Sequence, residues 1–236
     1  MVSLRLAGVA ALLLLLLPSP AQSFTDVTVA ATVAYVAPET LPPQLLNTPP
    51  AEGSGVWKSE IEAMRGFQSN ILPDDRKAMQ SEQAFNIDLI TPVLGKDFTR
   101  ERLPLTFGLL DKIFKDTRRI VEADKKFWHM RRPYLADPHI TLLIDPLDDS
   151  PSYPSGHACV VRVLGEVLGL LYPDRLADLR NRAEDVGWHR IQSGVHYPTD
   201  IAAGQSLASL VIGALLQTPA FRQDLEAARQ EIAKAK

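Results

Sequence analysis

The sequence predicts an all-α protein, a single-domain helical bundle around one core. Three observations support this prediction. From about residue 57 onward, apolar residues recur at spacings of three and four, which places them on one face of successive helices. The sequence shows neither a convincing strand-like alternation nor an internal repeat. Its 236 residues are 46% hydrophobic and 22% charged, which is ordinary globular composition and enough apolar material for a buried core.

Charge and cysteine content exclude several functional classes. The chain has 25 Lys and Arg against 28 Asp and Glu, a net charge of −3, whereas nucleic-acid-binding proteins usually carry a basic excess. We therefore expect no nucleic-acid partner. Cys159 is the single cysteine, which excludes a disulfide framework within one chain and any zinc site of the CxxC type.

Residues 1–23 have the form of a secretory signal peptide. A short basic region ends at Arg5, and an unbroken apolar run of twelve residues, Leu6–Leu17, follows it. Ala21 and Ser23 place small residues at the −3 and −1 positions of a cleavage site. Twelve apolar residues are too few to span a bilayer, which disfavours an uncleaved anchor. The expected location is the periplasm or the exterior.

Residues 24–55 are rich in proline, and we expect them to form an extended N-terminal arm. The pairs Pro42-Pro43 and Pro49-Pro50 prevent a long helix, because proline lacks an amide proton and clashes with the preceding turn. A free linker would leave three leucines exposed to solvent: Leu41, Leu45 and Leu46. We therefore expect the arm to lie on the domain that follows.

Residues 56–236 are expected to form a single all-helical domain. A first helix begins near Trp57, and Pro73 begins a break. Further helices are expected over residues 104–131, 157–171, 174–190, 198–216 and 220–234. The apolar stretch Ile201–Leu216 contains Gln205 and is too short to span a membrane, so we interpret it as a core helix and expect no stable membrane insertion.

A first chemical cluster consists of Lys125 and Arg132, seven residues apart at the end of the long helix. Seven residues are close to two turns, so both cations would project from one helix face, about 10 Å apart along the axis. Pro133 biases Arg132 out of helical geometry. The alternative for this cluster alone is a solvated basic face.

A second cluster precedes an apolar helix. Ser155 is a natural N-cap, and Gly156 allows the backbone to approach a bound group closely. The helix end would then direct free amide protons and a positive dipole at an anion, with His157 at the mouth of that site. The alternative is a plain helix cap with a surface histidine.

A third cluster consists of Arg190, His196 and Asp200. His196 and Asp200 are four residues apart, so the carboxylate can accept a proton from one imidazole nitrogen and leave the other with a free lone pair. The same pair is also compatible with half of a metal site, or with a purely structural role.

Taken together and in order, the three clusters resemble the signature of the type 2 phosphatidic acid phosphatase superfamily. That superfamily includes bacterial class A non-specific acid phosphatases, membrane lipid phosphatases and vanadium haloperoxidases. The Pro-rich arm, Ser152-Tyr153 before Pro154 and Gly194 before His196 are similar to the soluble acid phosphatases, over most of residues 36–217. The sequence departs from the family at His189, where serine is usual, and at Ser193, where many members have cysteine.

The resemblance implies a helical bundle of the superfamily kind and a secreted or periplasmic acid phosphatase. Such an enzyme hydrolyses phosphate monoesters through a phosphohistidine, without a metal or cofactor. His196 would be the nucleophile, Asp200 would orient it, and His157 would protonate the leaving group. The phosphate would be held by five residues: Lys125, Arg132, Ser155, Gly156 and Arg190.

Three other interpretations stay open at this point. A vanadate-dependent haloperoxidase-like enzyme would bind vanadate in the same site, and an assay with vanadate, peroxide and bromide would detect it. A lipid phosphate phosphatase would share the chemistry but take a lipid substrate. A non-catalytic secreted helical protein would require the three clusters to coincide without a role. The sequence also leaves the natural substrate and a homo-oligomeric state open.

Overall fold

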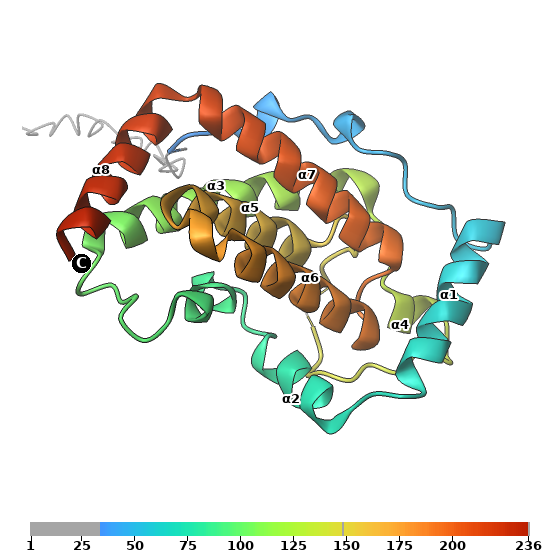
Figure 1. Ribbon diagram of the computed structural model, residues 1–236. Coiled ribbons are helices and arrows are strands. Elements are labelled where there is room, and N and C mark those ends of the chain that lie inside the picture. The colour runs from blue at the N-terminus through green and yellow to red at the C-terminus, as the bar shows by residue number, and fades with distance from the viewer. Residues whose placement is uncertain (1–33, 148, 236) are drawn as a thin grey trace, which may run out of the picture. The chain divides into compact units, whose positions relative to one another are not determined.

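The computed structural model describes residues 34–147 and 149–235, and it is helical without strands across them (Figure 1). The signal-peptide prediction and the first ten residues of the predicted arm lie outside the described residues. The α-helices are α1 (Gly55–Gln68), α2 (Pro73–Ser81), α3 (Pro104–Trp128), α4 (Pro133–Ala136), α5 (Gly156–Leu171), α6 (Leu176–Gln192), α7 (Pro198–Gln217) and α8 (Pro219–Ala235). Short 3-10 helices are η1 (Pro38–Thr40), η2 (Pro43–Leu45), η3 (Ile87–Leu89), η4 (Thr91–Leu94) and η5 (Pro173–Arg175). The predicted all-α class is confirmed.

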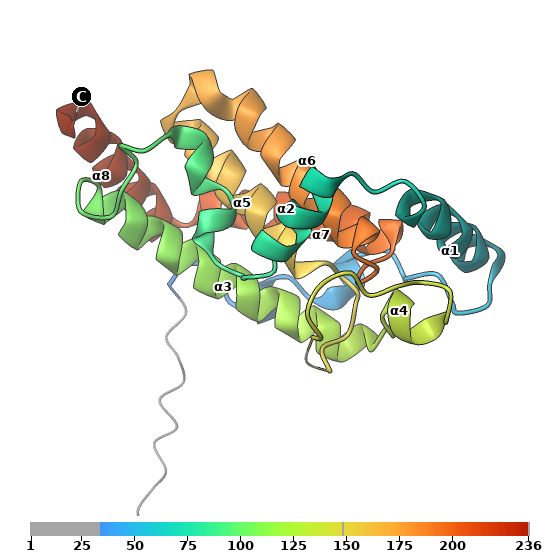
Figure 2. The same ribbon diagram turned by 90° about the horizontal axis from the view of Figure 1, so that it is seen from below.

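Helix α5 is the centre of the bundle, because α3, α6 and α7 all pack against it (Figures 1 and 2). It is apolar on nearly every face, and Val160, Leu164 and Leu168 are fully buried. Gly169 allows α6 to approach closely, since a Cβ at this position would lie 2.4 Å from the Leu176 side chain. The first residues of α5 carry the second chemical cluster, so the core positions that cluster directly.

Helix α7 is longer than the apolar stretch considered in the sequence, because it begins at Pro198. Its 20 residues are long and apolar enough, by length and composition alone, to cross a membrane, so the expectation that the stretch is too short was wrong. One face packs against α5, with Leu207 and Ala208 buried there. A Cβ on Gly204 would lie 2.6 Å from the Ser155 carbonyl oxygen, which shows how closely α7 approaches the start of α5. One face of α7 is thus packed within the helical bundle.

Two predicted helix boundaries were wrong. Pro73 does not begin a break but occupies the first position of α2, where its missing N–H costs nothing. Helix α3 ends at Trp128 rather than at residue 131, because His129 adopts a left-handed conformation with φ of 51°. Phe127, which the sequence placed on the apolar stripe of this helix, is 48% exposed.

The arm runs along the helical domain from residue 34 to Ser54, and its prolines begin η1 and η2. Leu41 and Leu46 are buried as expected, whereas Leu45 is 52% exposed. The Asp116 carboxylate of α3 accepts hydrogen bonds from the backbone amides of residues 34–36 at 2.7–3.2 Å. A buried carboxylate on α3 therefore fixes the start of the described arm.

Asp124 is a second buried carboxyl group on α3, and neither of its oxygens has a hydrogen-bond partner among the described residues. Burial raises its pKa to about 7. This pKa is higher in the folded chain than in the unfolded one. At pH 4 the folded group is therefore neutral and its burial costs little free energy of unfolding. Stability then falls progressively as the pH rises from about 4 to about 7, and it levels off above pH 7.

We expect Asp124→Asn to be more stable than the wild type at pH 8, by roughly 2 kcal/mol after allowance for solvent screening, and equally stable at pH 4. Urea unfolding at both pH values measures this difference. The exposed Asp185 of α6 provides the matched control, since Asp185→Asn should change stability by less than about 0.5 kcal/mol. A loss of stability in Asp124→Asn at both pH values would contradict the interpretation.

Candidate active site

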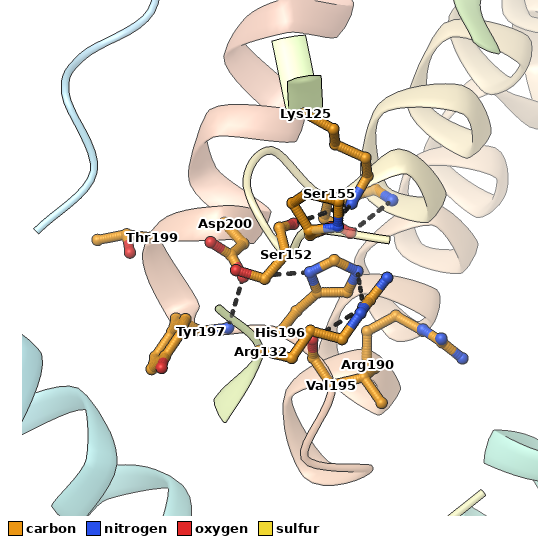
Figure 3. Close-up of polar contacts among 12 residues, drawn as sticks. Lys125, Arg132, Ser152, Ser155, Arg190, Val195, His196, Tyr197, Thr199 and Asp200 are labelled. Atoms are coloured by element: carbon orange, nitrogen blue, oxygen red, sulfur yellow. Dashed lines mark hydrogen bonds and ion pairs between the residues drawn. The ribbon is translucent and has the colours of Figure 1, made fainter. Parts of the chain in front are cut away.

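The three chemical clusters meet at one cavity of about 430 Å³ (Figure 3). Six of the eight predicted site residues line it: Lys125, Arg132, Gly156, His157, Arg190 and His196. The other two, Ser155 and Asp200, are fully buried and contact each other through the backbone, with Ser155 N donating to Asp200 O at 3.0 Å. This hydrogen bond joins the start of α5 to the first turn of α7.

Lys125 and Arg132 reach the cavity by different routes. Lys125 lies in the last turn of α3, but Arg132 lies beyond the helix in an extended conformation, with φ of −68° and ψ of 150°. The prediction that both project from one helical face was therefore wrong, whereas the expected effect of Pro133 on Arg132 is confirmed. Both side chains are buried, so they do not form a solvated basic face.

Backbone carbonyl groups hold both cations in place. Lys125 Nζ donates to the carbonyl oxygens of Pro151 and Ser152, and Arg132 Nε donates to Ser150 O at 2.8 Å. Arg132 Nη1 also donates to Val195 O at 3.0 Å. The two side chains thus tie the segment before α5 to the segment before α7. Their charges are positioned before any ligand arrives.

The start of α5 has the predicted cap. The Ser155 hydroxyl oxygen accepts from Ala158 N at 3.4 Å, and Gly156 is the first helical residue. A Cβ on Gly156 would lie 3.3 Å from Val121, so a larger residue would crowd this wall of the cavity. Because the Ser155 hydroxyl serves the cap and is buried, it does not line the cavity in this structure.

His196 and Asp200 form the predicted pair. The distance from His196 Nδ1 to Asp200 Oδ2 is 3.1 Å, and the same oxygen accepts from Tyr197 N at 2.9 Å. A proton on Nδ1 leaves the lone pair of Nε2 facing the cavity, where Arg132 Nη1 lies 3.4 Å away. Within the described ranges, no group of three or more His, Cys, Asp or Glu residues has the arrangement of a metal site.

Arg190 lies on α6 and is 2% exposed. Its Nε and Nη1 atoms have no hydrogen-bond partner in the part of the chain that the structure describes. A buried cation without a partner is unfavourable, so donors of this kind indicate a site that an anion occupies. The guanidinium is able to bind two oxygens of a phosphate at once.

Burial and the three cations set the protonation of the site. Burial, followed by the charge of Arg190, lowers the pKa of His157 well below its usual value. Burial, followed by Arg132, does the same to the pKa of His196. Burial also lowers the pKa of Arg190 to about 10, although this group stays charged at neutral pH. The cavity is therefore cationic, with both imidazoles neutral, and an entering dianion would favour protonation of a histidine.

Three residues outside the motifs, which the sequence did not indicate, support the site: Phe85, Trp57 and Glu60. The Phe85 ring packs on the His157 ring with centroids 4.7 Å apart. Trp57 Nε1 donates to the Tyr197 hydroxyl at 3.1 Å, and Glu60 accepts from Thr199 N at 2.8 Å. Phe85, Trp57 and Glu60 lie far from the motifs in the sequence and follow no recognisable spacing, so no local signal marks them.

The two positions at which the sequence departs from the family pattern are both occupied by hydrogen-bonded side chains. His189 Nδ1 lies 2.8 Å from Glu82 Oε2, and the Ser193 hydroxyl donates to Arg190 O at 3.1 Å. Ser193 is therefore accommodated locally at the end of α6, whereas His189 contacts a residue far away in the sequence.

Comparison with known proteins identifies the family to which this helical domain belongs. Residues 112–224 match the family model of the PAP2 superfamily, so this chain contains a PAP2 superfamily domain. The matched range includes all eight predicted site residues. The resemblance inferred from the three clusters is confirmed at this level.

The chain is similar to several characterised phosphatases. A non-specific acid phosphatase of Salmonella typhi is 28% identical over 197 residues, covering 79% of this chain and 78% of the relative. An acid phosphatase of Zymomonas mobilis is 32% identical, covering 60% of this chain and 55% of the relative. An undecaprenyl-diphosphatase of Sulfolobus acidocaldarius is 34% identical, covering 46% of this chain and 59% of the relative. Among solved structures, a transmembrane PAP2-type phosphatidylglycerolphosphate phosphatase from Bacillus subtilis has a TM-score of 0.49 and 19% identity, covering 68% of this chain and 85% of that one.

Proposed function

We propose that this chain is a secreted or periplasmic acid phosphatase that hydrolyses phosphate monoesters through a phosphohistidine on His196, without a metal. The PAP2 domain and the acid phosphatase relatives identify the chain as a phosphoric monoester hydrolase. The single observation that carries the finer proposal is the cavity itself. It is lined by buried Arg190, whose Nε and Nη1 have no partner among the described residues, and by His196, whose Nδ1 is held by Asp200.

Binding of the phosphoryl group uses charge that is already in place. Lys125, Arg132 and Arg190 surround the cavity and neutralise the oxygens of a phosphate dianion, as in other phosphoryl-transfer sites. The amide of Gly156, at the positive end of α5, adds a backbone donor. Three cations supply the charge stabilisation that a divalent metal supplies elsewhere.

In the first chemical step, His196 Nε2 attacks phosphorus and forms a nitrogen–phosphorus bond as the ester oxygen departs. Asp200 holds Nδ1–H and stabilises the positive charge that develops on the ring. His157, with Nε2 unpaired among the described residues, donates its proton to the leaving alkoxide. In the second step, His157 takes a proton from water, the water oxygen attacks phosphorus, and inorganic phosphate leaves His196.

Resistance to chelators tests the metal-free part of this proposal. We expect hydrolysis of p-nitrophenyl phosphate to be unchanged after dialysis against EDTA, because the charge of the cavity comes from side chains. Vanadate should inhibit, because it adopts the five-coordinate geometry of the transferring phosphoryl group. Activity that disappears in EDTA and returns with zinc or magnesium would contradict the proposal.

A lipid phosphate substrate is a second candidate, favoured by the similarity to an undecaprenyl-diphosphatase. Comparison of phosphatidic acid in detergent micelles with glycerol 3-phosphate distinguishes the two. A preference for the lipid of more than about ten-fold in kcat/KM would favour it, because such a preference requires about 1.4 kcal/mol of transition-state binding by the apolar tail.

A further inference from the structure

A buried ion cluster lies at the contact between α2 and α6, two helices that are neighbours in Figures 1 and 2. Glu82, the residue that ends α2, has a side chain only 3% exposed. Its Oε1 accepts from Arg182 Nη1 at 2.5 Å, and its Oε2 lies 2.8 Å from His189 Nδ1. Both carboxylate oxygens are therefore bound by α6 side chains.

This cluster contacts the site on two sides. His189 directly precedes Arg190 on α6, so the bond to Glu82 constrains the turn that carries Arg190, whose Nε and Nη1 have no partner among the described residues. On the other side, the backbone of Glu82 forms a hydrogen bond with His157. The next residue, Gln83, lines the cavity. Glu82 thus lies between the expected general acid and one expected phosphate ligand.

The negative charge of Glu82 also affects Arg190. Burial alone raises the pKa of Glu82, but the hydrogen bonds from His189 and Arg182 outweigh it, so the pKa is lowered and the group is ionised. Its negative charge favours the charged form of Arg190, which burial and Arg132 oppose. An arginine this deeply buried beside another cation needs a nearby counter-charge.

We propose that Glu82 is a positioning residue, whose clamped carboxylate fixes the end of α2 so that its backbone orients His157 while its charge stabilises Arg190. The inference rests on the proposed function, because it assigns Glu82 an effect on two groups of the phosphatase mechanism. The catalytic groups themselves stay those named above. This role also explains why histidine replaces the usual serine at position 189, since the His189 side chain holds one of the two Glu82 carboxylate oxygens.

The test compares E82Q and E82D with the matched control E166Q. Glu166, on α5, is also held by two arginines, with both oxygens 2.8 Å from Arg180 and one 2.9 Å from Arg162, but it belongs to no part of the site. Kinetics with glycerol 3-phosphate and p-nitrophenyl phosphate, inhibition by inorganic phosphate, and pH profiles are measured on each full-length protein.

For E82Q, we expect kcat for glycerol 3-phosphate to fall about ten-fold or more, the scale for loss of a buried charged hydrogen bond. The alkyl ester should suffer more than the p-nitrophenyl ester, because the alkoxide depends more on His157. The inhibition constant for phosphate should rise several-fold, because Arg190 loses its counter-charge. E82D keeps the charge, so its phosphate affinity should stay near that of the wild type while kcat for the alkyl ester falls.

The pH profile separates positioning from mere folding. Lys125, Arg132 and Arg190 face His157 and disfavour its protonation, and the Glu82 backbone bond opposes them. With that bond weakened, the limb due to His157 should move to lower pH in E82Q and stay in place in E166Q. A simple loss of folded protein would reduce the amplitude without moving the limb.

If E82Q matches E166Q in ester preference, phosphate inhibition and pH profile, the inference is wrong. If E82Q does not fold, His189→Ser removes one clamp and keeps the carboxylate. A wild-type ester preference and pH limb in that variant would also refute the inference. A wild type that hydrolyses neither ester would instead refute the proposed function, which keeps the two failures apart.

Discussion

Replacement of His196 by alanine is expected to abolish hydrolysis of every phosphate ester, whatever its leaving group. No other described side chain combines a lone pair that faces the cavity with a carboxylate partner on the opposite ring nitrogen. Loss of a nucleophile of this kind reduces kcat by roughly four to six orders of magnitude. Steady-state assays with p-nitrophenyl phosphate and an alkyl phosphate measure the loss. His139, an exposed histidine, provides the control, since His139→Ala should retain full activity.

Trapping of the intermediate tests the same assignment independently. Enzyme quenched during turnover of a radiolabelled ester should carry label that is stable in base and labile in acid, as expected for a phosphorus–nitrogen bond. The label should lie on His196 and be absent from His196→Ala. Label on His157, or no label under burst conditions, would contradict the proposed nucleophile.

Replacement of His157 by alanine should have an effect that depends on the leaving group. General acid catalysis contributes about 10²–10⁴-fold, and it matters most when the departing oxygen is strongly basic. We therefore expect kcat for alkyl phosphates to fall by about this amount, whereas p-nitrophenyl phosphate should lose much less. The rate plotted against leaving-group pKa should become steeper in the variant. An equal loss for all esters would indicate that His157 serves binding or packing instead.

The pH dependence follows from the same residue. Burial and the nearby cations lower the pKa of His157, so its charged form is lost as the pH rises through this lowered value. A bound phosphate dianion offsets the cations and raises the pKa again within the complex. We therefore expect a mildly acidic optimum in the wild type. The fall on the alkaline side should be absent from His157→Ala with p-nitrophenyl phosphate.

The sequence by itself determined the fold class and identified the three motifs that meet at the cavity, because the signals for both are local. Helical periodicity predicted α3 and α5–α8, and Ser155-Gly156 indicated an N-cap that the structure contains. The four-residue spacing of His196 and Asp200 indicated their contact, which forms where His196, just before α7, meets Asp200 in the first turn of that helix.

Only the tertiary structure decided how these parts meet and what holds them. Arg132 reaches the cavity from an extended segment after α3, because the chain turns at His129 and Pro133 keeps Arg132 out of a helix. Glu82 and His189 are 107 residues apart and meet because α2 packs on α6. The burial of Leu46 and exposure of Leu45 likewise depend on how the arm lies on the helices. Contacts of this kind depend on the packing of distant segments, and the residues involved carry no spacing that the sequence alone reveals.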